Sequence, residues 1–167
     1  MNPLHWSFRT AFAICALVVA ALLGYAYYAQ FQLELEPCPL CIFQRVAMIA
    51  LFVVALAAAL HDPRGAGRRV YGALASLAAL AGVAIAGRHV WLQHLPPDQV
   101  PACGPGLDYL LDTFPLSQTL RKVFTGSGEC ATVDWRFAGL SMPEWTLIWF
   151  VLLLAGALYY GFRRYRS

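Results

Sequence analysis

Four cysteines form the most chemically informative pattern in this 167-residue chain. Cys38 and Cys41 belong to the motif Cys-Pro-Leu-Cys, whereas Cys103 and Cys130 stand far apart in a more polar stretch. A disulfide that closes so small a loop removes little chain entropy, so the first pair is a poor structural staple. Cys-x-x-Cys is instead typical of a redox-active pair whose thiolate is stabilised. The fifth cysteine, Cys15, lies in an apolar run and is expected to act as a small apolar side chain.

Two further features support a reactive Cys41. The residue is expected at the start of a helix, where unpaired backbone N–H groups stabilise a thiolate. Arg45 follows four residues later, about 6 Å along the helix axis, and adds positive charge to the same place. Arginine also anchors helices at a membrane interface, and Arg45 can serve both purposes.

Zinc binding is an alternative reading of a Cys-x-x-Cys motif. Structural zinc sites normally combine two close pairs of cysteine or histidine ligands. Cys103 and Cys130 are widely separated, and neither has a histidine close to it in the sequence. The spacing therefore favours redox chemistry and predicts no metal ligands.

The second cysteine pair is expected to lie on loops. Cys103 follows a proline-rich stretch and Cys130 follows one rich in glycine and serine. Such a pair suits thiol exchange, in which a thiolate attacks a disulfide through a mixed-disulfide intermediate. A structural disulfide between these two cysteines remains the alternative.

The elements that carry these cysteines are expected to be membrane helices. Hydrophobic residues make up 60% of the chain and charged residues only 13%, against about half and a quarter in soluble domains. Four apolar runs predict spans at about 9–29, 42–60, 70–90 and 144–162, near the length of about 20 residues that crosses a bilayer. Buried core helices are a poor alternative, because too little polar chain is left to cover them. The first run could be a signal peptide, but its length and its aromatic end favour a retained helix.

The expected fold class is an all-α membrane protein, an antiparallel four-helix transmembrane bundle formed by residues 1–167 as one domain. Outer loops are predicted at 30–41 and 95–142. Within the longer loop, apolar residues at helical spacing over 107–124 indicate short amphipathic helices on the membrane surface, with a small soluble subdomain as the alternative.

The distribution of charge predicts the orientation. The end that holds both termini and the 61–69 connection has seven arginines against one acidic residue, whereas the other end has five basic and eight acidic residues. The more basic end should be cytoplasmic, which leaves all four loop cysteines outside. The net charge of +3 thus reflects membrane topology, and no nucleic-acid partner is expected.

Three segments carry a resemblance to a known family. They are E-P-C-P-L-C-I-F-Q-R at 36–45, R-H-V-W-L-Q at 88–93, and G-E-C-A-T-V-D-W-R-F-A-G-L-S-M-P-E-W at 128–145. With four spans in the same order, the chain resembles the DsbB family of bacterial inner-membrane thiol oxidases over nearly its whole length.

The resemblance implies a membrane thiol:quinone oxidoreductase that reoxidises a periplasmic DsbA-like thiol oxidase and passes electrons to the membrane quinone pool. Ubiquinone is the expected quinone, with menaquinone as the alternative. By the family's pattern, Cys103 would join the partner and Cys130 would exchange with the Cys38–Cys41 pair. Cys41 would face the quinone, with Arg45 and His89 beside its ring.

Two other functions compete with this one. A membrane scaffold with disulfide-stapled loops would show no redox turnover. A four-span reductase with electrons flowing in the opposite direction would use similar chemistry, but it would carry its Cys-x-x-Cys in a different span order. The place of Cys38 and Cys41 at the second span favours the oxidase.

Overall fold

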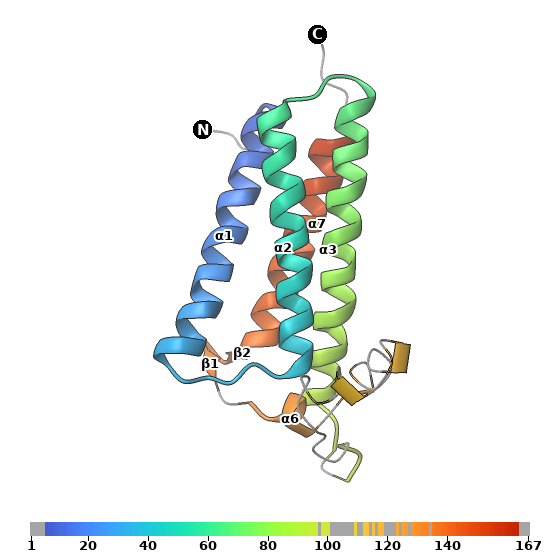
Figure 1. Ribbon diagram of the computed structural model, residues 1–167. Coiled ribbons are helices and arrows are strands. Elements are labelled where there is room, and N and C mark those ends of the chain that lie inside the picture. The colour runs from blue at the N-terminus through green and yellow to red at the C-terminus, as the bar shows by residue number, and fades with distance from the viewer. Residues whose placement is uncertain are drawn as a thin grey trace.

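The computed structural model describes residues 6–96, 98–100, 128–133 and 135–163, together with residues 109, 112, 113, 115, 117, 118, 123, 125 and 126. Its four long helices are α1 (Phe8–Gln32), α2 (Pro39–His61), α3 (Ala66–Gln93) and α7 (Met142–Phe162). They run alternately up and down as an antiparallel bundle (Figure 1). The expected all-α, four-helix fold class is therefore confirmed.

Local signals fix where these helices begin and end. Ser7 precedes α1 and its hydroxyl oxygen accepts a hydrogen bond from the backbone N–H of Thr10 at 3.1 Å. Pro39 is the first residue of α2, a position where its missing N–H costs nothing. At the other end of α2, Asp62 adopts a left-handed conformation with φ of 39° and stops the helix. Because α2 begins at Pro39, two residues before Cys41, Cys38 becomes its N-cap.

Small residues let α3 and α7 pack closely. A Cβ atom added at Gly72 would lie 2.5 Å from the Cα atom of Gly161. One added at Gly82 would lie 2.1 Å from the ring of Phe150, which is fully buried. Close backbone approach at small residues is a common way to join membrane helices, where lipid is as apolar as the side chains.

Around this core, the outward faces of the helices are apolar. The side chains of Leu17, Leu60 and Leu77 are between 66% and 70% exposed. Soluble proteins rarely expose large continuous apolar surfaces of this kind. Each of the four helices is long and apolar enough to cross a membrane. The chain is thus a multi-pass membrane protein.

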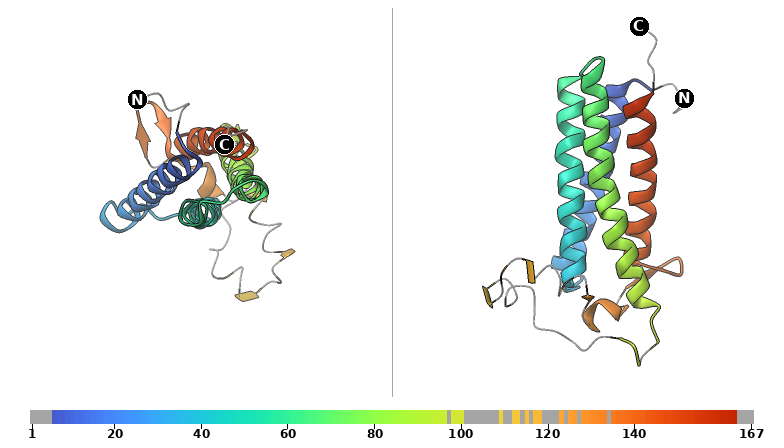
Figure 2. Two further views of the ribbon diagram at one scale, coloured as in Figure 1. Left: turned by 90° about the horizontal axis from the view of Figure 1, so that it is seen from above. Right: turned by 90° about the vertical axis from the view of Figure 1, so that its right-hand side faces the viewer.

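The small elements lie together at one end of the bundle. They are the short helix α6 (Gly128–Ala131) and the antiparallel strands β1 (Arg136–Phe137) and β2 (Leu140–Ser141), in which Phe137 pairs with Leu140. The start of α1 and the end of α7 lie at the opposite end (Figures 1 and 2). The amphipathic helices expected over 107–124 fall largely outside the described residues, and so does Cys103.

Seen along its axis, the bundle places α2 between α1 and α3, with α7 beside α3 (Figure 2). Contacts are extensive between α3 and α7, α1 and α2, and α2 and α3, whereas the contact between α1 and α7 is much smaller. The bundle is therefore least tightly closed along the α1–α7 side.

Candidate functional site

The two cysteines of the Cys-Pro-Leu-Cys motif meet at the first turn of α2. Cys38 is the N-cap, and its sulfur accepts a hydrogen bond from the backbone N–H of Cys41 at 3.4 Å. The two sulfur atoms lie 3.1 Å apart, and both cysteines are free. A sulfur at a helix N-cap is well placed to carry negative charge, since it faces the unpaired N–H groups of the first turn. The helix start thus brings both sulfur atoms of the motif to the N-terminal end of α2.

His89 reaches this pair from the neighbouring helix α3. Its Nε2 atom lies 3.7 Å from the sulfur of Cys38, and the residue is 2% exposed. The family resemblance implied a place for His89 beside a quinone ring. The structure brings it into contact with Cys38, so it can hold or release a proton at that sulfur.

Gln44 fixes the orientation of His89. Its side-chain amide nitrogen lies 3.0 Å from Nδ1 of His89, and Gln44 is 5% exposed. Sequence reasoning missed this residue. The available signal was a polar side chain one helical turn after Cys41, within an otherwise apolar span.

Arg45 connects the same end of α2 to α1. Its guanidinium donates hydrogen bonds to the side-chain oxygen of Gln30 and, at 3.0 Å, to the carbonyl oxygen of Ala26. It also lies over the ring of Tyr27, 5.1 Å from the ring centroid. The positive charge of Arg45 is thus held in place near the thiols. Gln30, like Gln44, is a residue of the site that the sequence analysis did not identify.

A cavity of about 480 Å³ opens at this end of the bundle. Cys38, Cys41, Arg45 and His89 all line it, and most of the rest of its wall is apolar or aromatic. Part of that wall comes from α1 and α7, which have little contact with each other. Its aromatic members include Tyr25, Trp135, Phe137, Trp145 and Trp149. Such a site suits a flat apolar ligand with a few polar atoms.

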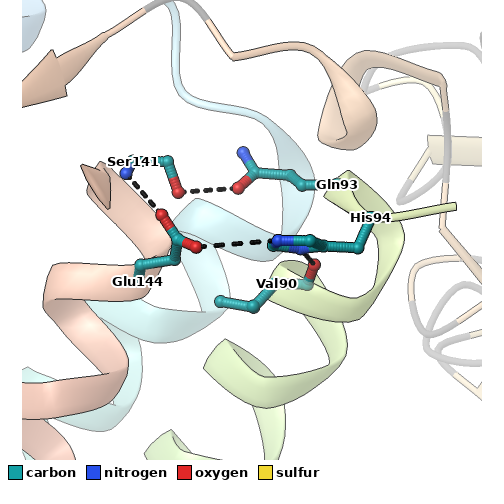
Figure 3. A network of polar contacts seen from close by, with 5 residues as sticks. All are labelled: Val90, Gln93, His94, Ser141 and Glu144. Carbon is teal, nitrogen blue, oxygen red and sulfur yellow. Dashed lines mark hydrogen bonds and ion pairs between the residues drawn. The ribbon is translucent and has the colours of Figure 1, made fainter. Parts of the chain in front are cut away.

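A polar network holds the end of α3 and the start of α7 together beside the cavity (Figure 3). The hydroxyl of Ser141 donates to the side-chain oxygen of Gln93 at 2.7 Å, and its backbone N–H donates to Glu144 at 2.6 Å. The other carboxylate oxygen of Glu144 lies 3.8 Å from His94. Because Gln93 also lines the cavity, this network fixes one of its walls.

Cys130 lies close to the motif even though it is far from it in the sequence. It belongs to α6, which contacts α3, and it is 1% exposed. Cys130 interacts electrostatically with Cys41, and its backbone interacts with His89. The structure therefore brings together Cys38, Cys41, Cys130, Arg45 and His89 of the predicted site residues. Cys103 lies outside the described residues.

Comparison with known proteins finds one family and several relatives that this chain resembles. The family described as "Disulfide bond formation protein DsbB" matches residues 8–160. A "Disulfide bond formation protein B" of Xanthomonas axonopodis pv. citri is 54% identical over 168 residues, covering 100% of this chain and 98% of that protein. One from Nitrosococcus oceani is 55% identical over 149 residues, covering 89% and 86% of the two chains.

A third relative of the same name, from Hahella chejuensis, is 52% identical over 143 residues and covers 86% of this chain and 87% of that protein. The family match, over residues 8–160, covers nearly all of the four long helices and the region of Cys130. Together with the family match, they show that the chain belongs to the DsbB family of disulfide bond formation proteins.

Proposed function

We propose that this protein is a quinone-dependent thiol oxidase that reoxidises a soluble DsbA-like dithiol protein in the periplasm. The observation that carries the proposal is the free Cys38–Cys41 pair, with sulfur atoms 3.1 Å apart, in the wall of a largely apolar cavity. A thiol pair needs an electron acceptor for repeated turnover. An apolar cavity between membrane helices favours an acceptor that dissolves in lipid.

The electron path runs through two thiol–disulfide exchanges. The partner dithiol is oxidised as the Cys103–Cys130 disulfide is reduced to two thiols. Those thiols are then reoxidised by the Cys38–Cys41 disulfide, which is itself reduced. A quinone bound in the cavity takes two electrons and two protons from the resulting Cys38–Cys41 dithiol, and it leaves as a quinol.

The neighbouring side chains have separate tasks in this path. The helix start stabilises a thiolate on Cys41. His89 exchanges a proton with the sulfur of Cys38, at a separation of 3.7 Å. Arg45, held by Gln30 and the Ala26 carbonyl group, stabilises negative charge that develops in the cavity.

We also propose the bacterial inner membrane as the location, with both termini cytoplasmic and the cavity end facing the periplasm. The charge distribution supports this orientation, because basic residues predominate at the end of the bundle opposite the cavity. Ubiquinone is the preferred acceptor and menaquinone the second choice. The aromatic cavity wall supports a quinone ring of either kind.

The test uses full-length protein reconstituted with quinone and a reduced DsbA-like partner. We expect quinone consumption to follow partner oxidation with one quinone per disulfide formed. Cys41→Ser should abolish turnover, whereas Cys15→Ser should retain it, because Cys15 packs against the core of the bundle. The proposal fails if Cys41→Ser turns over like the parent, or if no quinone is reduced by the parent.

A further inference from the structure

Three soft or borderline metal donors meet at the outer end of the bundle. The sulfur atoms of Cys38 and Cys41 and a ring nitrogen of His89 all lie within 4.8 Å of one another. The Cys-x-x-Cys spacing alone argued against zinc, because no second ligand pair lies near it in the sequence. The fold supplies the missing ligand type from α3. We propose that the reduced Cys38–Cys41 pair and His89 form a binding site for a soft divalent cation such as Zn²⁺.

The distances between donors fit this assignment with a small adjustment. In a tetrahedral zinc site, a sulfur and a nitrogen ligand stand about 3.6 Å apart, given typical zinc–ligand distances. Cys38 Sγ and His89 Nε2 are 3.7 Å apart. Two sulfur ligands stand about 3.8 Å apart, and Cys38 Sγ and Cys41 Sγ are 3.1 Å apart. The Cys41 sulfur and the His89 ring nitrogen lie within 4.8 Å of each other, so a modest rotation of the Cys41 side chain can bring the three donors to the separations that zinc requires.

Gln44 provides the outer support that a zinc-bound histidine needs. A ligating histidine usually donates its other ring N–H to a fixed acceptor, which sets the tautomer and the ring orientation. The Gln44 amide lies 3.0 Å from Nδ1 of His89. A half-turn of that amide presents its oxygen to Nδ1–H and leaves the lone pair of Nε2 free for the cation.

The charge and the openness of the site also fit. Two thiolates neutralise a divalent cation, and the neutral imidazole adds no charge. All three donor residues line the cavity, so the fourth coordination position is open to a water molecule or another small ligand. A Cys₂His donor set with an open fourth position is an established arrangement for zinc.

The site exists only in the reduced protein, because a metal ligand must be a thiolate and the disulfide has none. Zinc would thus capture the dithiol form and prevent it from giving up electrons. This inhibition rests on the proposed function, whereas binding of the cation does not. The two can therefore be tested separately.

The binding test uses full-length protein in detergent that carries Cys103→Ser and Cys130→Ser, so that Cys15 within α1 is the only cysteine left outside the motif. After reduction and removal of the reductant, competition with a chromogenic chelator should show one Zn²⁺ per chain. The oxidised form should bind at least about 10-fold more weakly, because metal binding requires free thiolates. Equal binding by the two forms would overturn the proposal.

His89→Gln tests the third ligand. We expect it to weaken Zn²⁺ binding by about 10-fold or more, since even the outer partners of zinc ligands typically contribute 10- to 100-fold. His61→Gln, at the far end of α2, is the matched control and should bind like the parent. If His89→Gln and His61→Gln bind zinc equally well, His89 is not a ligand.

A spectroscopic measurement on the same reduced protein without a histidine substitution avoids dependence on the folding of His89→Gln. X-ray absorption of its zinc complex should show two sulfur ligands at about 2.3 Å and a nitrogen ligand at about 2.0 Å. A first shell without sulfur, or without an imidazole nitrogen, would overturn the proposed site. If zinc binds at this site but leaves the quinone-dependent turnover of the parent protein unchanged, the predicted inhibition is wrong and the binding site stands.

Discussion

The side-chain amide of Gln44 lies 3.0 Å from Nδ1 of His89, and both residues are almost fully buried. This contact directs the other ring nitrogen of His89 toward the sulfur of Cys38. The reactive face of the histidine is thus set by a residue of α2, the helix that also carries the cysteine motif.

Replacing Gln44 by leucine should therefore impair both stability and turnover. The substitution leaves a buried ring nitrogen without a partner, at a cost of about 1–3 kcal/mol in unfolding free energy. The pH dependence of kcat should change as well, because the tautomer of His89 is no longer fixed. Thermal unfolding and kcat against pH would measure the two effects. The exposed Gln32→Leu is the control, and a parent-like pH profile for Gln44→Leu would contradict this role.

Replacing Arg45 by methionine should lower kcat/KM for quinone by about 100-fold, the typical effect of removing one preorganised donor. Arg45→Lys should restore only part of this loss, because an ammonium group cannot reproduce the two directed contacts of the guanidinium with Gln30 and Ala26. Steady-state kinetics with varied quinone would measure the effect. Arg69→Met, at the opposite end of the bundle, should behave like the parent. Equal kcat/KM for Arg45→Met and the parent would refute the assignment.

Two glycine-to-alanine substitutions should have opposite consequences. Gly72→Ala forces a Cβ atom to within 2.5 Å of the backbone of Gly161, so we expect a loss of about 1–3 kcal/mol from overpacking. Gly156→Ala meets nothing within 4 Å and should be neutral or stabilising, since alanine favours a helix by about 1 kcal/mol over glycine. Thermal unfolding in one detergent compares them directly. Equal melting temperatures would show that the close approach is relieved at no cost.

Cys130→Ser should trap the soluble partner. The remaining thiol of Cys103 can exchange with the disulfide of an oxidised partner, and the cysteine that would otherwise resolve the adduct is gone. A non-reducing gel should show a complex of the two proteins that reductant dissolves. The double variant Cys103→Ser, Cys130→Ser should form none. An adduct that survives in the double variant would mean that another cysteine receives the partner.

The four helices could be predicted from sequence because their signal is compositional. Long uncharged runs have few structural solutions in a membrane, since every backbone polar group must be satisfied within the segment. Cys38 and Cys41 were equally visible, because their spacing is local. These two cysteines could be predicted because a single short motif at the start of a helix contains both of them.

The side-chain contacts between different helices were harder to predict. Nothing in the spacing of residues 38–45 and 88–93 indicates that His89 touches Cys38 or that Gln44 orients it, because side-chain direction depends on how α2 and α3 are rotated and packed. The same holds for Gln30, which meets Arg45 only because α1 lies beside α2. Such contacts depend on packing, and sequence periodicity specifies packing only loosely.

The close approach of Gly72 and Gly161 also bears on how this sequence can change over time. An added Cβ atom at either position lies 2.5 Å from the Cα atom of the other. An ordinary core clash can be relieved by a smaller residue opposite, but both partners here are already the smallest residue. Neither substitution can be compensated by its neighbour, so we expect sequence drift to be blocked at both positions unless the two helices move apart.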